Sequence, residues 1–205
     1  MNNINSNKYV LATANSGKIK EMQKLLSDLN ISVITRDDLG IKDEIEETGS
    51  TFFENAKIKA DAICRISGLP SIADDSGLVV ESLGGNPGVY SSSYGGDKLS
   101  AAERCLYLLK NMENMEQRNA KFVSVIVCVY PDGKLIEAIG ECKGRITYKP
   151  EGTGGFGYDP VFKPEGLSKT MAELTTDEKN IISHRGIALR NFFSLLKTGS
   201  EGDCI

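Results

Sequence analysis

The stretch AKFVSVIVCVYPDGKLIEAIGEC, residues 120–142, decides how the sheet of this protein is built. Residues 120–130 are rich in β-branched side chains, which favour strands. Pro131-Asp132-Gly133 has the residue types of a tight turn, and residues 134–142 can form a second strand. Two strands joined by so short a turn run antiparallel, so this stretch predicts a β-hairpin.

Toward the N-terminus, predicted strands and helices alternate instead. Residues 8–14 (KYVLATA) read as a short buried strand, and the next segment places apolar side chains on one helical face, at Ile19, Met22, Leu25, Leu26 and Leu29. The alternation continues with a strand at 31–35, a helix over about 50–67, and extended segments at 71–74 and 77–81. Such alternation is typical of parallel strands, so the sheet as a whole is predicted to be mixed.

Helices are also predicted in the second half of the chain. A helix near 98–113 is expected to bury one face, formed by Leu99, Ala102, Leu106 and Leu109. Thr175 and Glu178 have the spacing of a capping box, which indicates a helix start. We expect disorder from about residue 198. No repeat or linker divides the chain, so we predict one α/β domain over residues 1–205, with a mixed sheet flanked by helices.

Composition excludes several classes of function. The chain has 205 residues, of which 40% are apolar, enough for a sizeable core. Its net charge of −4 argues against duplex nucleic acid or an acidic membrane as the partner and favours a small molecule. The single histidine, His184, excludes any site that needs two or three imidazoles.

The cysteines and the chain start predict a cytoplasmic protein. There are five cysteines, and none lies within three positions of another, so neither a zinc knuckle nor a redox pair can be drawn. The N-terminal residues lack the basic and apolar run of a signal peptide, and no apolar stretch approaches the ~20 residues of a membrane span.

The first candidate site is Thr13-Ala14-Asn15-Ser16-Gly17-Lys18, between the first strand and the first helix. A helix N-terminus offers backbone N–H groups to an anion, and Lys18 adds a positive charge. The segment is not a Walker motif, because Ala12 and Ile19 stand where that motif needs Gly and Ser or Thr. It is either a phosphate cradle or an ordinary strand-to-helix turn.

The glycine-rich segment at Gly152–Gly157 fits G-x-G-x-x-G but does not fit a dinucleotide site. Such a site must open a helix, whereas Pro160 disfavours helical geometry at Asp159. The remaining interpretation is a flexible loop whose backbone can approach a ligand, with Phe156 and Tyr158 able to offer an aromatic face.

Two acidic pairs are candidates for a metal site. Glu46-Glu47 lies in a loop, and Asp74-Asp75 follows an apolar strand, so its carboxylates are expected at a strand end. Mg²⁺ prefers a few carboxylates together with phosphate oxygens and water. Glu46-Glu47 can equally be a solvated acidic loop, whereas two adjacent carboxylates at Asp74-Asp75 repel each other without a cation.

The last candidate lies at the start of the final helix, where Lys179 is followed by Ser183-His184-Arg185. Cationic groups at a helix N-terminus oppose the helix dipole, and a bound anion or an electron-rich base would offset that conflict. The alternative is that His184 is a structural residue.

Taken together, these segments resemble the inosine triphosphate pyrophosphatase family. The resemblance runs from about residue 9 to 196, and five blocks occur in family order and spacing: LATANSGK, EETGSTFFENAKIKA, ADDSGLVVESLGGNPGVYS, GFGYDPVF and MAELTTDEKNIISHRGIAL. Two departures are Ala14, where many relatives have Gly, and Ser92-Ser93, where many bacterial relatives have Ala-Arg.

The resemblance implies Mg²⁺-dependent hydrolysis of inosine, deoxyinosine and xanthosine triphosphates to the monophosphate and pyrophosphate. It implies an elongated α/β fold with a cleft between two lobes, and usually a homodimer. Asp75 would be the general base and, with Glu47, a metal ligand. The implied substrate-binding residues are Thr13, Asn15, Ser16, Gly17, Lys18 and Ser76 and, for the base and ribose, Phe156, Gly157, Tyr158, Asp159, Lys179, His184 and Arg185.

Two other functions are also compatible with the sequence. One is a related pyrophosphatase that prefers modified pyrimidine nucleotides, and the other is a nucleotide-binding module without turnover. For the favoured function, we expect a water molecule to attack the α-phosphorus in line with the leaving pyrophosphate. The base would be read through its C6 carbonyl, which adenosine lacks.

Overall fold

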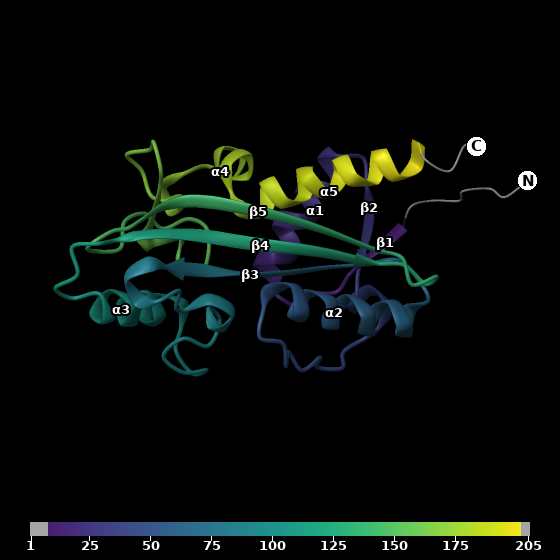
Figure 1. Cartoon of the computed structure of the whole chain (residues 1–205), viewed down its shortest axis with the longest axis horizontal. Helices are drawn as coiled ribbons and strands as arrows, with labels where there is room; N and C mark the ends of the chain where they lie inside the picture. The colour runs from purple at the N-terminus through teal and green to yellow at the C-terminus, as the bar shows by residue number, and fades with distance from the viewer. Residues whose placement is uncertain (1–7, 202–205) are drawn as a thin grey trace, which may run out of the picture. The chain divides into compact units, whose positions relative to one another are not determined.

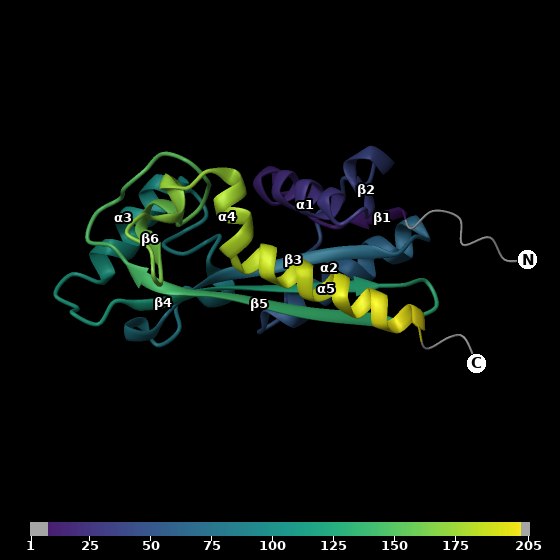
Figure 2. The same ribbon diagram turned by 90° about the horizontal axis from the view of Figure 1, so that it is seen from above.

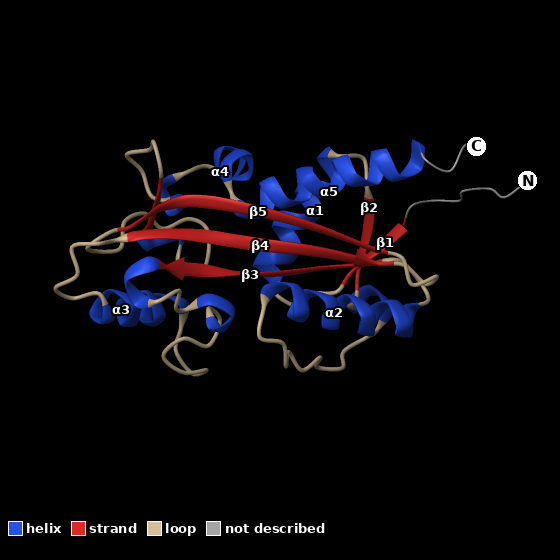
Figure 3. Cartoon of the chain, in the orientation of Figure 1, coloured by secondary structure: helices blue, strands red, loops and turns tan. Residues whose placement is uncertain are grey.

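The computed structural model of the chain describes residues 8–201. Five α-helices and six strands lie in this range, with short 3₁₀ turns between them (Figure 3). In chain order these elements are β1 (Lys8–Leu11), α1 (Ser16–Asp28), β2 (Ser32–Thr35), α2 (Phe52–Ser67), β3 (Ser71–Val80), α3 (Ala101–Asn111), β4 (Asn119–Val129), β5 (Leu135–Ile146), β6 (Phe162–Pro164), α4 (Thr176–Ile182) and α5 (His184–Glu201).

The hairpin predicted from residues 120–142 is confirmed, as β4 and β5. At the turn, the Tyr130 amide donates to the Lys134 carbonyl at 2.9 Å, and Asp132 Oδ1 accepts from the Lys134 amide at 2.9 Å. At the far end, the Ile146 amide donates to the Arg118 carbonyl at 2.8 Å. As the residue number rises in β4, the number of its partner in β5 falls, from Arg118 with Ile146 to Tyr130 with Lys134. This is the register of an antiparallel pair.

The sheet is mixed, as the sequence predicted. Its strand order is β2-β1-β3-β4-β5-β6. Strand β1 pairs in parallel with β2 and with β3, through registers such as Lys8↔Ser32 and Val10↔Ser71. Strand β6 pairs antiparallel with β5. The α/β prediction is therefore confirmed.

The chain forms two compact units. Unit 1 comprises residues 1–75, 125–140 and 186–205, and unit 2 comprises residues 76–124 and 141–185. Strands β3, β4 and β5 contribute residues to both units. The two lobes, the cleft between them and the single domain over 1–205 stay predictions.

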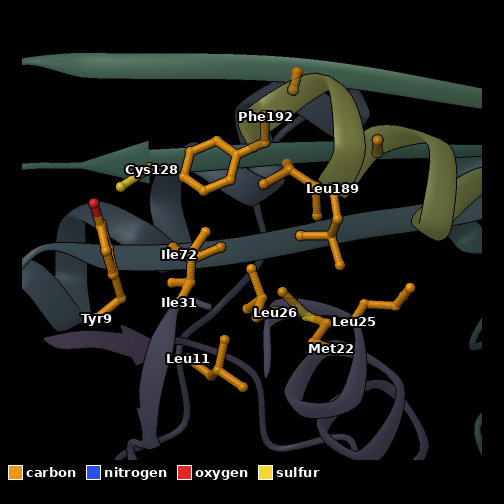
Figure 4. Packing of buried hydrophobic residues seen from close by; sticks show 13 residues of the cluster. Tyr9, Leu11, Met22, Leu25, Leu26, Ile31, Ile72, Cys128, Leu189 and Phe192 are labelled. Carbon is orange, nitrogen blue, oxygen red and sulfur yellow. The ribbon is translucent and has the colours of Figure 1, made fainter. Parts of the chain in front are cut away.

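In unit 1, helices cover both faces of the strands. Helices α1 and α5 lie on one face and α2 on the other (Figure 1), and α1 lies beside β2 (Figure 2). The core on the first face contains Leu25 and Leu26 of α1 and Leu189 and Phe192 of α5, whose side chains point toward one another (Figure 4). The helical periodicity in these segments thus places the apolar stripes inward.

In unit 2, helix α3 buries a face that agrees only in part with the one predicted. Cys105, Leu108 and Met112 are buried, whereas Leu106 is 56% exposed and Ala102 is exposed. The prediction is wrong for Ala102 and Leu106, whereas Leu109 is partly buried and packs against the same core cluster. Apolar residues on more than one face of this helix explain the difference.

Strand β3 corrects another expectation. The extended segments expected at 71–74 and 77–81 form one strand of ten residues, which runs through Asp74, Asp75 and Ser76. The acidic pair therefore lies inside a strand and not at its end. The predicted capping box of Thr175 and Glu178 is present at the start of α4.

The remaining expectations concern the C-terminus, the cysteines and membranes. Helix α5 continues to Glu201, beyond the expected onset of disorder at about 198, and residues 202–205 lie outside the described residues. Cys64, Cys105, Cys128 and Cys142 are free and buried, whereas Cys204 is not described. Within residues 8–201, every helix is too short or too polar to cross a bilayer.

Candidate active site

The turn from Thr13 to Lys18 is closed by its own side chains. Asn15 caps helix α1, because its Oδ1 accepts from the Gly17 amide at 3.0 Å and from the Lys18 amide at 3.1 Å. The Asn15 amide in turn donates to Thr13 Oγ1 at 3.2 Å. An anion would compete with Asn15 for the amides of Gly17 and Lys18, so the cradle is less open than the sequence suggested.

Asp74 and Asp75 point to opposite faces of β3, because side chains alternate along a strand. Asp74 is fully buried and pairs with Lys18, whose Nζ lies 2.8 Å from Asp74 Oδ2. Asp75 pairs instead with Lys59 of α2, with Nζ 2.8 Å from Oδ1. The expected repulsion between adjacent carboxylates therefore does not arise, and each carboxylate has its own cation.

Lys59 is a site residue that the sequence analysis missed. Its Nζ donates to Asp75 Oδ1 at 2.8 Å and to Glu47 Oε2 at 2.9 Å, so it bridges the two expected metal ligands. Burial acts to lower the pKa of Lys59, but the charges of Asp75 and Glu47 outweigh burial and raise it. The sequence did contain a signal for this role, because Lys59 lies on the same helical stripe as the buried Ala56, Ala60 and Ile63.

Asp75 has one oxygen that no described residue satisfies. Its Oδ2 is buried and lacks a hydrogen-bond partner within residues 8–201. Burial raises the pKa of Asp75 to about 6, although the charges of Lys59 and Lys18 act to lower it. A buried carboxylate oxygen without a partner costs free energy, which a bound cation would recover.

The carboxylates of Asp75 and Glu47 fit Mg²⁺, the metal that the sequence analysis expected. Both are hard oxygen donors, and both contact the same ammonium group, that of Lys59. Asp75 Oδ2 has no hydrogen-bond partner among the described residues. No group of three or more metal-ligating side chains occurs among the described residues. Phosphate and water oxygens would have to complete the coordination, as is common for Mg²⁺.

The loop that carries Glu47 folds back along α2. Glu54 Oε2 accepts from the amides of Ser50 at 2.7 Å and Thr51 at 3.1 Å. One residue further along the helix, Asn55 Oδ1 accepts from the Gly49 amide at 2.8 Å. Lys59 in turn contacts Glu47. Three residues in the N-terminal half of α2, Glu54, Asn55 and Lys59, therefore hold the loop in place.

Gly49 is the tightest point of that loop. A Cβ at this position would lie 2.6 Å from Glu54 Cβ and 2.7 Å from Asn55 Oδ1. We expect Gly49→Ala to lower the free energy of unfolding by about 1–3 kcal/mol and to weaken Mg²⁺ binding, because Glu47 must move. Urea unfolding and calorimetric titration with MgCl₂ measure the two effects.

Gly40→Ala is the matched control for that variant. Gly40 has a φ of 71°, but its missing Cβ would meet open space. Alanine there costs about 1 kcal/mol of backbone strain and should leave Mg²⁺ affinity unchanged. Equal Mg²⁺ affinity in both variants would show that Gly49 does not place Glu47.

In unit 2, Asp159 organises the glycine-rich loop. Its Oδ2 accepts from the Phe156 amide at 2.8 Å and from Lys179 Nζ at 2.6 Å. Gly155 has a φ of 69°, and a Cβ there would lie 2.0 Å from Asp159 Oδ2. The glycine is therefore needed both for its backbone conformation and for the close approach of the carboxylate.

The Phe156 ring makes cation–π contacts with two side chains. Lys179 Nζ lies 4.6 Å and Arg185 Cζ 5.6 Å from its centroid, within cation–π range. Arg185 is 1% exposed, and its Nη2 donates to Ser76 Oγ at 2.9 Å. The structure thus brings together Ser76, Phe156, Lys179 and Arg185, four residues expected to bind substrate.

Tyr158 departs from the expectation. Its side chain is buried, and its hydroxyl donates to the Ser91 carbonyl at 3.0 Å. Burial raises the pKa of this phenol. The ring therefore belongs to the core and does not offer an aromatic face to a ligand, so Tyr158 and Gly157 can contribute only backbone groups. His184 stacks on Phe122 in unit 2.

Comparison with known proteins adds an independent finding. A sequence model of the Ham1 family matches residues 9–195. A dITP/XTP pyrophosphatase of Shigella flexneri is 45% identical over 196 residues, covering 94% of this chain and 99% of that protein. One from Deinococcus radiodurans is 48% identical, covering 89% of each. The solved structure of a HAM1 protein from Coxiella burnetii has a TM-score of 0.85 and 42% identity, covering 93% of this chain and 98% of that one.

Proposed function

This chain belongs to the Ham1 family, and we propose that it hydrolyses non-canonical purine nucleoside triphosphates to the monophosphate and pyrophosphate. The substrates proposed are the triphosphates of inosine, deoxyinosine and xanthosine. Similarity to dITP/XTP pyrophosphatases supports this class. The observation that carries the proposal is the buried Asp75, with one open oxygen, held beside Glu47 by Lys59.

The two carboxylates and the anion-binding turn are assigned to the triphosphate and the metal. Glu47 and Asp75 would hold Mg²⁺, which when bound offsets charge on the phosphates. Lys18, now paired with Asp74, supplies a cation to the triphosphate, and Asn15 exchanges its capping contacts for contacts with the anion. Thr13, Ser16 and Gly17 complete this anion-binding turn.

Asp75 is assigned the proton transfer. Water attacks the α-phosphorus, the bond from that phosphorus to the bridging oxygen breaks, and pyrophosphate leaves with the bond's electron pair. The water proton passes to the Asp75 carboxylate. In the metal-free protein, burial raises the pKa of Asp75 above that of an exposed carboxyl group, which makes this carboxylate the more basic one and favours it as the proton acceptor.

The residues around Phe156 are assigned to the base and ribose. The Phe156 ring offers a stacking face for a purine, and Lys179 and Arg185 lie at that ring as donors. Donors at the C6 position would pair with the carbonyl of inosine and xanthosine, whereas an amine there would meet another donor. His184 and Ser76 are assigned to the same end of the nucleotide, and Asp159 keeps Lys179 and Phe156 in place.

The test is release of pyrophosphate from a panel of nucleotides by purified protein with Mg²⁺. We expect turnover of inosine and xanthosine triphosphates at a kcat/KM well above that of adenosine triphosphate. Preference for a modified pyrimidine would support the related pyrophosphatase instead. Nucleotide binding without pyrophosphate release would indicate a non-catalytic module.

The pKa of Asp75 predicts how metal binding depends on pH. In the metal-free protein, protons compete with Mg²⁺ for Asp75 as the pH falls through about 6. Mg²⁺ affinity should therefore drop about tenfold between pH 7.5 and pH 5.0. Calorimetric titration with MgCl₂ at the two pH values measures this, and an affinity that does not change would mean that Asp75 is not a ligand.

The proposal extends to the assembly and the cellular location. We propose a homodimer in the cytoplasm, with a nucleotide and not a nucleic acid polymer or a membrane as the partner. Sedimentation at micromolar protein concentration tests the dimer.

A further inference from the structure

Phe122 of β4 and His184 of α5 form a parallel pair of rings within unit 2. Their centroids lie 4.7 Å apart, and the ring planes differ by only 13°. Each of the two side chains is 6% exposed. The imidazole of a residue assigned to base recognition therefore rests flat on a phenyl ring.

Phe122 is itself held in place from another side. The ring of Phe162, which is completely buried, lies 4.6 Å from the Phe122 ring at an angle of 57°. Both phenylalanines belong to the core cluster of unit 2. The phenyl face under His184 is consequently fixed by packing.

The orientation of an imidazole decides what it can recognise. Both ring nitrogens donate or accept within the plane of the ring. Rotation about the second side-chain torsion of histidine has broad preferences, so the side chain alone does not set that plane. A flat neighbour at stacking distance does set it, because any other plane loses ring contact.

We propose that Phe122 is a positioning residue for His184, and that by fixing the plane of the imidazole it sets the preference for purines with a C6 carbonyl. This inference rests on the proposed function, in which His184 reads the base. It assigns Phe122 no contact with substrate. An aliphatic residue such as leucine would keep the position apolar but would offer no flat face, so the shape of the ring and not only its hydrophobicity is the property required.

The single histidine makes the arrangement directly observable. In a ¹H–¹³C spectrum of the protein labelled at histidine, every imidazole signal belongs to His184. The face of Phe122 should shift these signals upfield through its ring current. In Phe122→Leu that shift should disappear, and in Phe122→Tyr it should persist.

The kinetic test compares kcat/KM for inosine triphosphate with kcat/KM for adenosine triphosphate. We expect the ratio to fall about fivefold in Phe122→Leu, as for one misplaced hydrogen bond, and to recover in Phe122→Tyr. Phe192→Leu is the matched control, because it removes a fully buried phenyl ring from the core of unit 1. It should lower stability and keep both the ratio and the His184 spectrum.

The outcomes separate the inference from the function on which it rests. A lost ring-current shift with an unchanged ratio overturns the positioning role, and so does an equal fall of the ratio in Phe192→Leu. An unchanged ratio in His184→Ala overturns the reading of the base by His184 and the inference with it. Wild-type protein that releases no pyrophosphate from inosine triphosphate overturns the proposed function itself.

Discussion

Asp75→Asn should lower kcat for inosine triphosphate by about 10³-fold, the scale of a lost general base. Asparagine has nearly the same shape but cannot take the water proton, and it is a poorer Mg²⁺ ligand than a carboxylate. The change also removes a buried charge that burial disfavours, as the raised pKa of about 6 shows. The fold should therefore survive while turnover is lost. Pyrophosphate release at saturating nucleotide and Mg²⁺, together with urea unfolding, measures both.

Asp61→Asn is the control for this variant. Asp61 lies on α2 in the same unit and pairs with Lys57, at a partly exposed position. Its carboxylate faces neither Lys59 nor the loop of Glu47 in any described contact, so turnover should stay at the wild-type rate. Wild-type turnover in Asp75→Asn would remove Asp75 from catalysis and leave the reaction without a base.

Lys59→Met should lower the free energy of unfolding by about 3 kcal/mol at pH 8.5 without Mg²⁺. The variant leaves Asp75 buried beside Glu47 without the ammonium that bridges them at 2.8 and 2.9 Å. Methionine fills a similar volume, so the loss is mainly electrostatic. Lys57→Met is the matched control, because its ion pair with Asp61 is partly exposed and should cost less than about 0.5 kcal/mol.

The destabilisation of Lys59→Met should depend on pH and on metal. The charge of Lys59 acts to lower the pKa of Asp75, so that pKa lies higher in the variant than in the wild type. As the pH falls toward 6, the folded variant takes up a proton before the folded wild type does, and the difference in unfolding free energy shrinks. Mg²⁺ should stabilise the variant more than the wild type. A destabilisation that is independent of both would mean that Lys59 acts through packing alone.

The features that the sequence predicted correctly are local. The hairpin of β4 and β5 follows from β-branched residues and turn chemistry within one stretch of chain. The capping box at Thr175 and the apolar stripe of α1 likewise depend on spacings of three or four residues. Local patterns of this kind determine an element whatever surrounds it.

The sequence-based predictions were wrong where contacts with residues far away in the chain determine the structure. Ser76-Gly77 has turn residues, yet β3 continues through them as one strand of ten residues with β4 as a neighbour in the sheet. Tyr158 follows a glycine-rich loop, yet its ring is buried with its hydroxyl on Ser91, 67 positions away. Leu106 fits a helical stripe, yet its side chain is exposed.

The kinds of elements, the mixed sheet, the family resemblance and all the candidate site residues except Lys59 can be predicted from the sequence. The partners of the charged residues are visible only in the folded chain: Asp74 pairs with Lys18 on one face of β3, and on the other face Lys59 pairs with both Asp75 and Glu47. Charge pairing and burial depend on distances between segments that are far apart in the chain. The sequence shows which side chains are present and how far apart they are along the chain. Only folding brings Lys59 between the carboxylates of Asp75 and Glu47.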